Sequence, residues 1–159
     1  MRTISNVFVV VLLVIGLTSC QNKEPENTNI PSAPVSFVLD VSLSGVDNAL
    51  RYENVGSSKL YDTRHPATMS SGHGLYGFSG VVVTRAMDNR LYAFDACCPY
   101  EVQKDNALVL DGFFVKCSKC GSSFEIGNGS GRVNEGPAKQ PLKRYNVYEA
   151  PSGLCTVTY

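Results

Sequence analysis

Alternating apolar and polar positions predict β-strands over most of this chain. The clearest alternation runs from residue 35 to 43, where every second residue is apolar: Val35, Phe37, Leu39, Val41 and Leu43. A period of two places these side chains on one face, which is typical of a half-buried strand. The folded domain is therefore expected to begin at Val35. Residues 44–71 show little periodicity, and only a short strand near 59–61 is expected there.

The second half of the chain predicts two hairpins and a closing pair of strands. The expected strands are, in chain order, 80–84, 90–95, 107–110, 113–116, 124–126, 143–149 and 154–159. The dipeptide Asp111-Gly112 favours a tight hairpin turn between the third and fourth of these. No stretch beyond the N-terminal segment has helical periodicity, so the pattern predicts an all-β domain.

The N-terminal segment has the features of a secretion signal. Residues 7–17 form an apolar run that follows Arg2 and is too short to span a bilayer. The run ends in Leu17-Thr18-Ser19-Cys20, which looks like a bacterial lipobox, in which the cysteine becomes acylated and forms the mature N-terminus. We expect a signal peptide at 1–19, a lipidated, disordered tether at 20–34, and one domain at 35–159.

Composition excludes some function classes. The chain has 159 residues, 18% of them charged, with a formal net charge of zero, and its basic residues form no stripe, so nucleic-acid binding is not expected. Only two histidines occur, His65 and His73, and neither lies near a nucleophile in the sequence. We therefore do not expect an enzyme. The motif at 72–77 matches G-x-G-x-x-G but leads into a strand, so it predicts a glycine loop and no dinucleotide site.

Four of the six cysteines lie in two short loops, each at the end of a predicted strand. The first loop is Cys97-Cys98-Pro99-Tyr100, and the second is Cys117-Ser118-Lys119-Cys120-Gly121. The C-x-x-C spacing of the second loop allows both thiolates to reach one metal ion. Cys155 alternates in phase with Val157 and Tyr159 and is expected to be a buried core thiol.

This arrangement resembles the Rieske proteins. Cys98-x-Tyr100, a gap of sixteen residues and Cys117-x-x-Cys120 match the family's C-x-H, fifteen to seventeen residues, C-x-x-H pattern. The likeness continues through 121–124, 136–138 and 145–147, and covers roughly residues 80–159. It implies a Rieske-like antiparallel β sandwich or barrel with a small two-loop subdomain that binds a cluster, and it implies electron transfer as the function.

The ligand set departs from that family. Tyr100 and Cys120 stand where the family has its two histidine ligands. Cys98 and Cys117 match the cysteine ligands, and Ser122 matches a serine that hydrogen-bonds cluster sulfide.

Three occupants of the cysteine loops remain open. The first is a 2Fe-2S cluster held by Cys98, Cys117 and Cys120, with Cys97 as the fourth thiolate, because four cysteines suffice for such a cluster. The second is a structural zinc ion on the same thiols. The third is no metal, with disulfides such as Cys98 to Cys120, which an oxidising compartment favours. His65 and His73 are further, weaker candidates as replacement ligands.

The expected function is that of a lipid-anchored protein of the bacterial cell envelope, with the outer membrane as the expected membrane. A cluster would give it a redox partner. A zinc or disulfide form would instead be a binding or structural lipoprotein with a partner at the cell surface. The membrane contact would be made through the acyl chains on Cys20.

Overall fold

The computed structural model describes residues 28–67, 69 and 74–159, and within them every paired strand is antiparallel. Cys20, the expected signal peptide and His73 lie outside the described residues. Among the described ones the regular structure is β apart from one short 3-10 helix, η1 (Asn48–Leu50). None of them forms a helix with the length and apolar character needed to cross a bilayer. The prediction of an all-β, antiparallel domain is confirmed.

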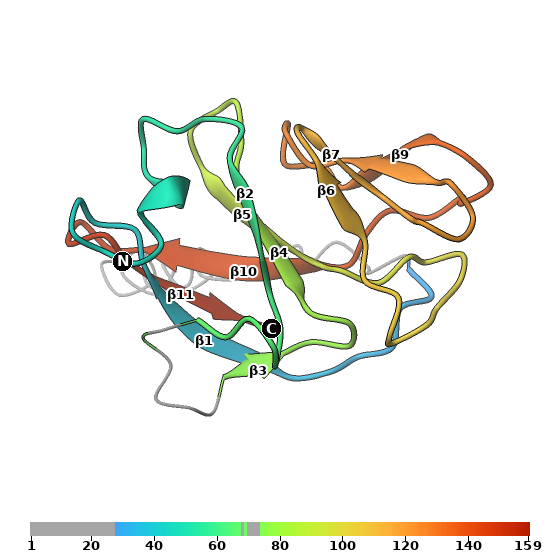
Figure 1. Cartoon of the computed structure of the whole chain (residues 1–159), viewed down its shortest axis with the longest axis horizontal. Coiled ribbons are helices and arrows are strands. Elements are labelled where there is room, and N and C mark those ends of the chain that lie inside the picture. The colour runs from blue at the N-terminus through green and yellow to red at the C-terminus, as the bar shows by residue number, and fades with distance from the viewer. Residues whose placement is uncertain (1–27, 68, 70–73) are drawn as a thin grey trace, which may run out of the picture.

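Seven strands form a large, strongly curved sheet in the order β2-β4-β5-β10-β11-β1-β3. Its strands are, in chain order, β1 (Val35–Asp40), β2 (Ser58–Tyr61), β3 (Leu75–Tyr76), β4 (Val81–Arg85), β5 (Leu91–Asp95), β10 (Arg144–Glu149) and β11 (Leu154–Thr158). The hairpin predicted between β4 and β5 is confirmed, with Val83 opposite Ala93. Figure 1 shows β10 crossing behind β2 and β4, so the sheet folds back over its own apolar face.

Four strands form a smaller sheet at one end of the molecule, coloured yellow to orange in Figure 1. They are β6 (Val109–Asp111), β7 (Phe114–Lys116), β8 (Ser123–Glu125) and β9 (Arg132–Glu135), paired in that order. The predicted β6–β7 hairpin is confirmed, and Gly112 takes a φ of 59° at its turn, a conformation that glycine adopts at little cost. This small sheet carries the second cysteine loop, between β7 and β8, and the first cysteine loop lies in the connection from β5 to β6.

The core of the large sheet consists of alternating side chains from both of its layers. Phe37 is only 2% exposed and packs against the rings of Tyr61 and Tyr76, with centroids 5.4 and 5.0 Å away. The alternation on β1 continues as far as Val41, but Leu43 is 75% exposed because the strand ends at Asp40 and the chain turns. The predicted strand was therefore too long at its C-terminal end. Cys155 is fully buried here, as predicted.

Buried charges also fasten the large sheet. The Arg85 guanidinium, 1% exposed, donates two hydrogen bonds to the carboxylate of Glu149 and one to the carbonyl of Leu50. Asp47 accepts hydrogen bonds from the Tyr61 hydroxyl and the Lys59 ammonium, each at 2.7 Å. Burial and this contact raise the pKa of Tyr61, so its hydroxyl keeps its proton. Each buried charge has a partner, as a stable interior requires.

The prediction of a disordered tether is wrong for residues 28–34, the part of that segment that the structure describes. Residues 28–34 lie along the domain, and the side chain of Ile30 is only 4% exposed. Asn29 and Gln140 exchange two hydrogen bonds, at 2.7 and 3.2 Å. A single apolar residue in a polar segment creates no periodicity, which is why the sequence pattern did not reveal this contact. The packed domain therefore begins before Val35.

Candidate metal centre

The first cysteine loop leaves β5 and is closed by backbone hydrogen bonds. Leu108 donates its N–H to the carbonyl of Ala96 at 2.8 Å, and Cys97 forms an isolated β-bridge with Ala107. Val102 donates to the carbonyl of Cys98 at 2.9 Å and has a φ of 47°, which is rare for a β-branched residue. These bonds hold Cys98 at the start of a tight turn whose backbone is fixed on both sides.

The second cysteine loop is a turn between β7 and β8. Cys117 donates its N–H to the carbonyl of Ser122 at 2.8 Å, and Gly121 donates to the carbonyl of Cys117 at 3.0 Å. Gly121 has a φ of 73°, so a residue with a side chain would be strained there. The turn brings the thiols of Cys117 and Cys120 to the same side.

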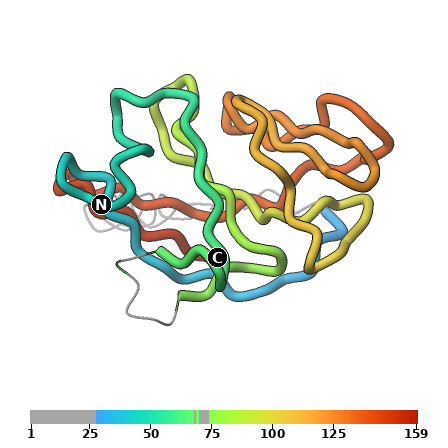
Figure 2. The backbone as a smooth tube through the Cα atoms, viewed as in Figure 1, coloured from blue at the N-terminus to red at the C-terminus, as the bar shows by residue number. Residues whose placement is uncertain are grey.

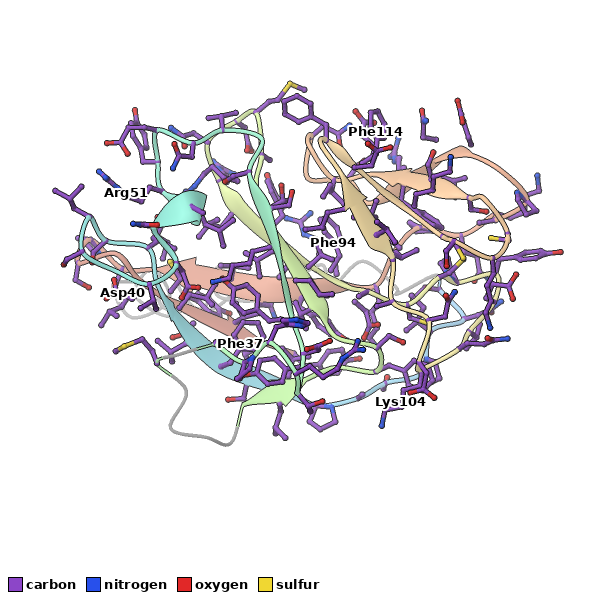
Figure 3. All side chains as sticks on the ribbon, in the orientation of Figure 1. Phe37, Asp40, Arg51, Phe94, Lys104 and Phe114 are labelled. Atoms are coloured by element: carbon purple, nitrogen blue, oxygen red, sulfur yellow. The ribbon has the colours of Figure 1, made fainter. Side chains whose placement is uncertain are left out.

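The two loops face each other, as predicted, and three thiols meet between them. The sulfur atoms of Cys98, Cys117 and Cys120 all lie within 4.8 Å of one another. The sulfurs of Cys98 and Cys120 are 3.7 Å apart. Cys98 and Cys117 are buried, and Cys120 is partly exposed. Figure 3 shows sulfur atoms close together at the end of the molecule that carries the small sheet.

Cys97 is outside this three-thiol group. Its thiol lies against the side chain of Ser79 and 3.5 Å from the carbonyl oxygen of Cys98. The reason is the extended backbone of the β-bridge, in which successive side chains point to opposite sides. The structure therefore does not bring the proposed fourth thiolate to the other three.

Asn106 is a site residue that the sequence analysis missed. Its side-chain amide donates to the sulfur of Cys117 at 3.5 Å, and its side-chain oxygen accepts a hydrogen bond from the Ser118 hydroxyl at 3.0 Å. Lys119 also donates across to the side chain of Gln103. These contacts join the two loops. An asparagine in a turn region carries no spacing signal, so only the folded chain identifies it.

Ser122 connects the second loop to the segment that covers it. Its hydroxyl oxygen lies 3.2 Å from the sulfur of Cys120 and accepts a hydrogen bond from the N–H of Ala138 at 3.0 Å. A side chain at Gly136 would come within 2.5 Å of the backbone of Ser122, so only glycine allows this approach. The segment from Gly136 to Ala138 therefore lies directly against the second cysteine loop.

The three thiols have different electrostatic surroundings. Burial raises the pKa of Cys98 to about 12, and the neighbouring thiols Cys120 and Cys117 add to this shift. Burial also acts to raise the pKa of Cys120, but hydrogen bonds with Ser122, Cys117 and Cys98 outweigh it, and the net pKa is lowered. A metal ion binds thiolates, so it would supply the positive charge that a deprotonated, buried Cys98 lacks.

All five described cysteines carry free thiols. The 3.7 Å between Cys98 and Cys120 is well beyond a disulfide bond of about 2.05 Å. Of the two candidate histidine ligands, His65 is among the described residues. It is not part of the three-thiol group, and its ring contacts the carboxylate of Asp62 at 3.0 Å instead. Tyr100 is 58% exposed.

The thiol positions can be tested against each candidate metal group. Two thiolates on one tetrahedral zinc ion, each with a bond of about 2.3 Å, lie about 3.8 Å apart. The spacing of the Cys98 and Cys120 sulfurs fits that geometry, and the sulfur of Cys117 lies within 4.8 Å of both. A 2Fe-2S cluster takes four cysteines, and here the fit is incomplete, because Cys97 points away.

Comparison with known proteins finds solved structures that are similar to this chain. No family model matches the chain, and no curated protein matches it. The chain is similar to one in the complex of reduced oxygenase and oxidized ferredoxin in carbazole 1,9a-dioxygenase, with 20% identity over 64% of this chain and 88% of that one, and a TM-score of 0.41. It is also similar to Sphingomonas yanoikuyae B1 ferredoxin, with 22% identity over 54% of this chain and 81% of that one, and a TM-score of 0.39.

Identities of 20% and 22% do not assign a function to this chain. What the fold and the site define is an all-β protein in which two cysteine loops at one end of a small sheet bring three thiols together.

Proposed function

We propose that this protein is a lipid-anchored electron-transfer protein of the bacterial cell envelope, with a Rieske-like domain whose thiols bind iron. The observation that carries the proposal is the convergence of three sulfur atoms, from two separate loops, within 4.8 Å of one another. Thiolates select soft or borderline metals such as iron in iron–sulfur centres and zinc. Hard cations such as magnesium or calcium prefer oxygen ligands and do not suit this site.

The surroundings of the site support a redox role. Cys98 and Cys117 are buried in an apolar cluster with Leu108, Val115 and Phe124, which shields the sulfurs from water. Cys120 is partly exposed, so the centre reaches the protein surface at one point. A bound iron–sulfur centre would accept and donate single electrons, and this chain's residues would set its charge, its hydrogen bonds and its exposure to solvent.

The ligands for a 2Fe-2S cluster would be Cys98, Cys117 and Cys120, with Cys97 as the fourth if its thiol turns inward. Ser122 and Asn106 would then lie beside two ligand sulfurs, at Cys120 and Cys117 respectively. Hydrogen bonds to ligand sulfur are among the features by which a protein tunes such a centre.

A structural zinc ion is the second candidate, and the spacing of Cys98 and Cys120 favours it. Three thiolates with a fourth ligand from water or protein complete the tetrahedral coordination of zinc. In that case the metal would hold the two loops together, and the lipoprotein would act as a binding or structural protein at the cell surface with a partner there.

Metal and sulfide analysis of the protein purified without oxygen tests these alternatives. A brown protein with visible absorption bands and acid-labile sulfide supports the cluster. A colourless protein with one zinc per chain supports the structural ion. A protein that contains neither iron nor zinc, and that has fewer free thiols than the five described cysteines, supports disulfides. This result would contradict both metal proposals.

Single substitutions identify the ligands. Cys98→Ser, Cys117→Ser and Cys120→Ser should each lose the metal, whereas Cys155→Ala, which removes a thiol buried in the large sheet, should retain it. Cys97→Ser discriminates between the two metal centres: it should abolish a four-cysteine cluster and leave a single ion bound. Retention of metal by all three ligand variants would refute the assigned site.

Anchoring through Cys20 is a separate part of the proposal. It rests on the sequence Leu17-Thr18-Ser19-Cys20 after an apolar run. Several acyl chains, each contributing about 0.8 kcal/mol per buried CH₂, would hold the domain on a membrane. Cys20→Ala should therefore release the protein into the soluble fraction, and membrane retention of this variant would contradict anchoring.

A further inference from the structure

The described residues that lead from Cys20 into the domain, 28–34, form the anchor segment. This segment meets the domain at the end that carries the three thiols. Asn29 exchanges its two hydrogen bonds with Gln140, which lies two residues after Ala138. Ala138 donates its N–H to Ser122, and Ser122 contacts Cys120. Figure 2 shows the start of the described chain, in blue, beside the yellow loop that follows Cys98.

Further contacts hold the segment in place. Ser32 accepts a hydrogen bond at 3.0 Å from the ammonium of Lys143, a residue that is 1% exposed. The side chain of Ile30 is buried, and the carbonyl of Pro34 accepts a hydrogen bond from the N–H of Gly77 at 3.1 Å. The chain is therefore attached to the domain from Asn29 onwards, and only the residues before Thr28 remain to connect it to Cys20.

That connection is short compared with the domain. Residues 21–27 separate Cys20 from Thr28, so the span between the two Cα atoms is at most about 29 Å. A domain of this length has a radius of gyration of about 14 Å, hence a diameter near 35 Å and a path of about 55 Å around to its opposite face. An anchor attached at Asn29 cannot reach that opposite face.

We propose that the thiol end of the domain faces the lipid surface, with Pro99 and Tyr100 beside the headgroups. The inference rests on the lipid anchor of the proposed function, and its occupant is the bilayer to which Cys20 is attached. Asn29, Pro99, Tyr100, Pro137, Lys139 and Gln140 line one shallow pocket of about 210 Å³, so the first cysteine loop adjoins the anchor segment directly. Tyr100 is 58% exposed at this surface, and an amphipathic ring suits a membrane interface.

The opposite end of the molecule provides a matched reference. Tyr52 is 69% exposed and lies in the chain next to Arg51, which Figure 3 places on the other side of the molecule from Lys104. Tyr52 borders a different pocket, with Leu43 and Pro151. The chain contains no tryptophan, so a single Tyr→Trp substitution at either end gives a fluorophore without background.

The test uses the full-length lipidated protein in vesicles that contain phospholipids with a nitroxide at the headgroup. Nitroxide quenches tryptophan only at close range. We expect the vesicles to reduce the fluorescence of Tyr100→Trp at least about twofold more than that of Tyr52→Trp, because the tether cannot reach around the domain. Equal quenching of both variants, stronger quenching of Tyr52→Trp, or no quenching of either overturns the orientation.

A longer tether provides the control. Twenty glycine and serine residues inserted between Gln21 and Asn22 lie outside the described contacts and raise the largest possible span to about 100 Å, which exceeds the path around the domain. The difference between the two tryptophan variants should then shrink, and an unchanged difference would mean that the tether does not set the orientation. Flotation of Cys20→Ala with the vesicles is measured in parallel. If that variant still floats, anchoring through Cys20 is wrong, and the proposed orientation is wrong with it. If it does not float, anchoring is supported, and the quenching result tests the orientation by itself.

Discussion

The large and small sheets of this protein bury their side chains to very different extents. All five residues of β4 and four of the five in β5 are buried, whereas all three residues of β6 are exposed and β9 has none that is fully buried. The apolar side chains that the small sheet does bury pack on Val82 and Phe94 of the large sheet. The small sheet has no complete core of its own.

This difference predicts where each sheet obtains its stability. Burial of apolar surface stabilises the large sheet, at roughly 25 cal/mol for each Å² removed from water. The small sheet depends more on loop contacts such as those of Asn106 and Ser122, and on whatever joins the three thiols. Changes in the large sheet should therefore affect the whole domain, and changes at the thiols should affect mainly β6 to β9.

The largest effect is expected from Phe37→Ala. Phe37 fills the space between Tyr61 and Tyr76 in the large sheet, and removal of a buried phenylalanine ring costs about 3–5 kcal/mol. Urea denaturation should show this loss in the free energy of unfolding. Tyr148→Ala, at a position 63% exposed, is the control and should cost far less. A loss below about 1 kcal/mol for Phe37→Ala would contradict the assigned core.

Asp95→Asn tests the junction between the two regions. Its carboxylate accepts hydrogen bonds from the N–H groups of Phe78, Ser79 and Cys97 and from the Tyr145 hydroxyl, although burial raises its pKa. An amide NH₂ would face one pair of these donors and leave them unpaired, which costs about 1–3 kcal/mol.

Denaturation with a probe in each sheet should therefore show loosening on both sides of Asp95. Asp88→Asn is the matched control, because Asp88 sits in an exposed turn and bonds with Tyr92 and Arg90. Its effect should stay within about 0.5 kcal/mol. Equal effects of the two substitutions would show that Asp95 has no special role at the junction.

Loss of the metal should affect the small sheet and leave the large sheet unchanged. Removing bound metal with a chelator, or the change Cys117→Ser, should speed hydrogen exchange at the paired residues Val115 and Phe124 by about tenfold or more, because the loops lose their shared ligand. Exchange at Phe37 and Val157, which pair in the large sheet, should not change. A uniform increase in both sheets would mean that they unfold as one unit.

The smallest effect is expected from Ser122→Ala. The substitution removes the acceptor for the Ala138 N–H and the hydroxyl beside Cys120, at a cost of about 1 kcal/mol. Thermal unfolding of the metal-bound protein measures it. Ser152→Ala is the control: its hydroxyl lies in an exposed turn of the large sheet and accepts one long hydrogen bond, at 3.4 Å from the N–H of Leu154, so a change within about 0.5 kcal/mol is expected. An equal or larger loss for Ser152→Ala would contradict the role assigned to Ser122.

Local sequence patterns determined most of the strands. Alternation over 35–41 and the apolar run at 80–84 predicted β1 and β4, because one or both faces of those strands are buried and every buried position must be apolar. The strands that the sequence analysis missed lack that signal. β9 has only Val133 as an apolar residue, and β3 has two residues, so neither shows a period.

For the site, the sequence determined which thiols were available, and the tertiary structure decided which of them meet. The spacing of the two cysteine loops predicted that Cys98, Cys117 and Cys120 would converge, since each loop follows a strand of a predicted hairpin. Spacing alone could not separate Cys97 from Cys98; the bridge between Cys97 and Ala107 does so, because an extended backbone sends neighbouring side chains to opposite sides. The contacts of Asn106 and of residues 28–34 are also tertiary, because each joins segments distant in the chain through polar groups or one isolated apolar side chain, which leave no periodic pattern.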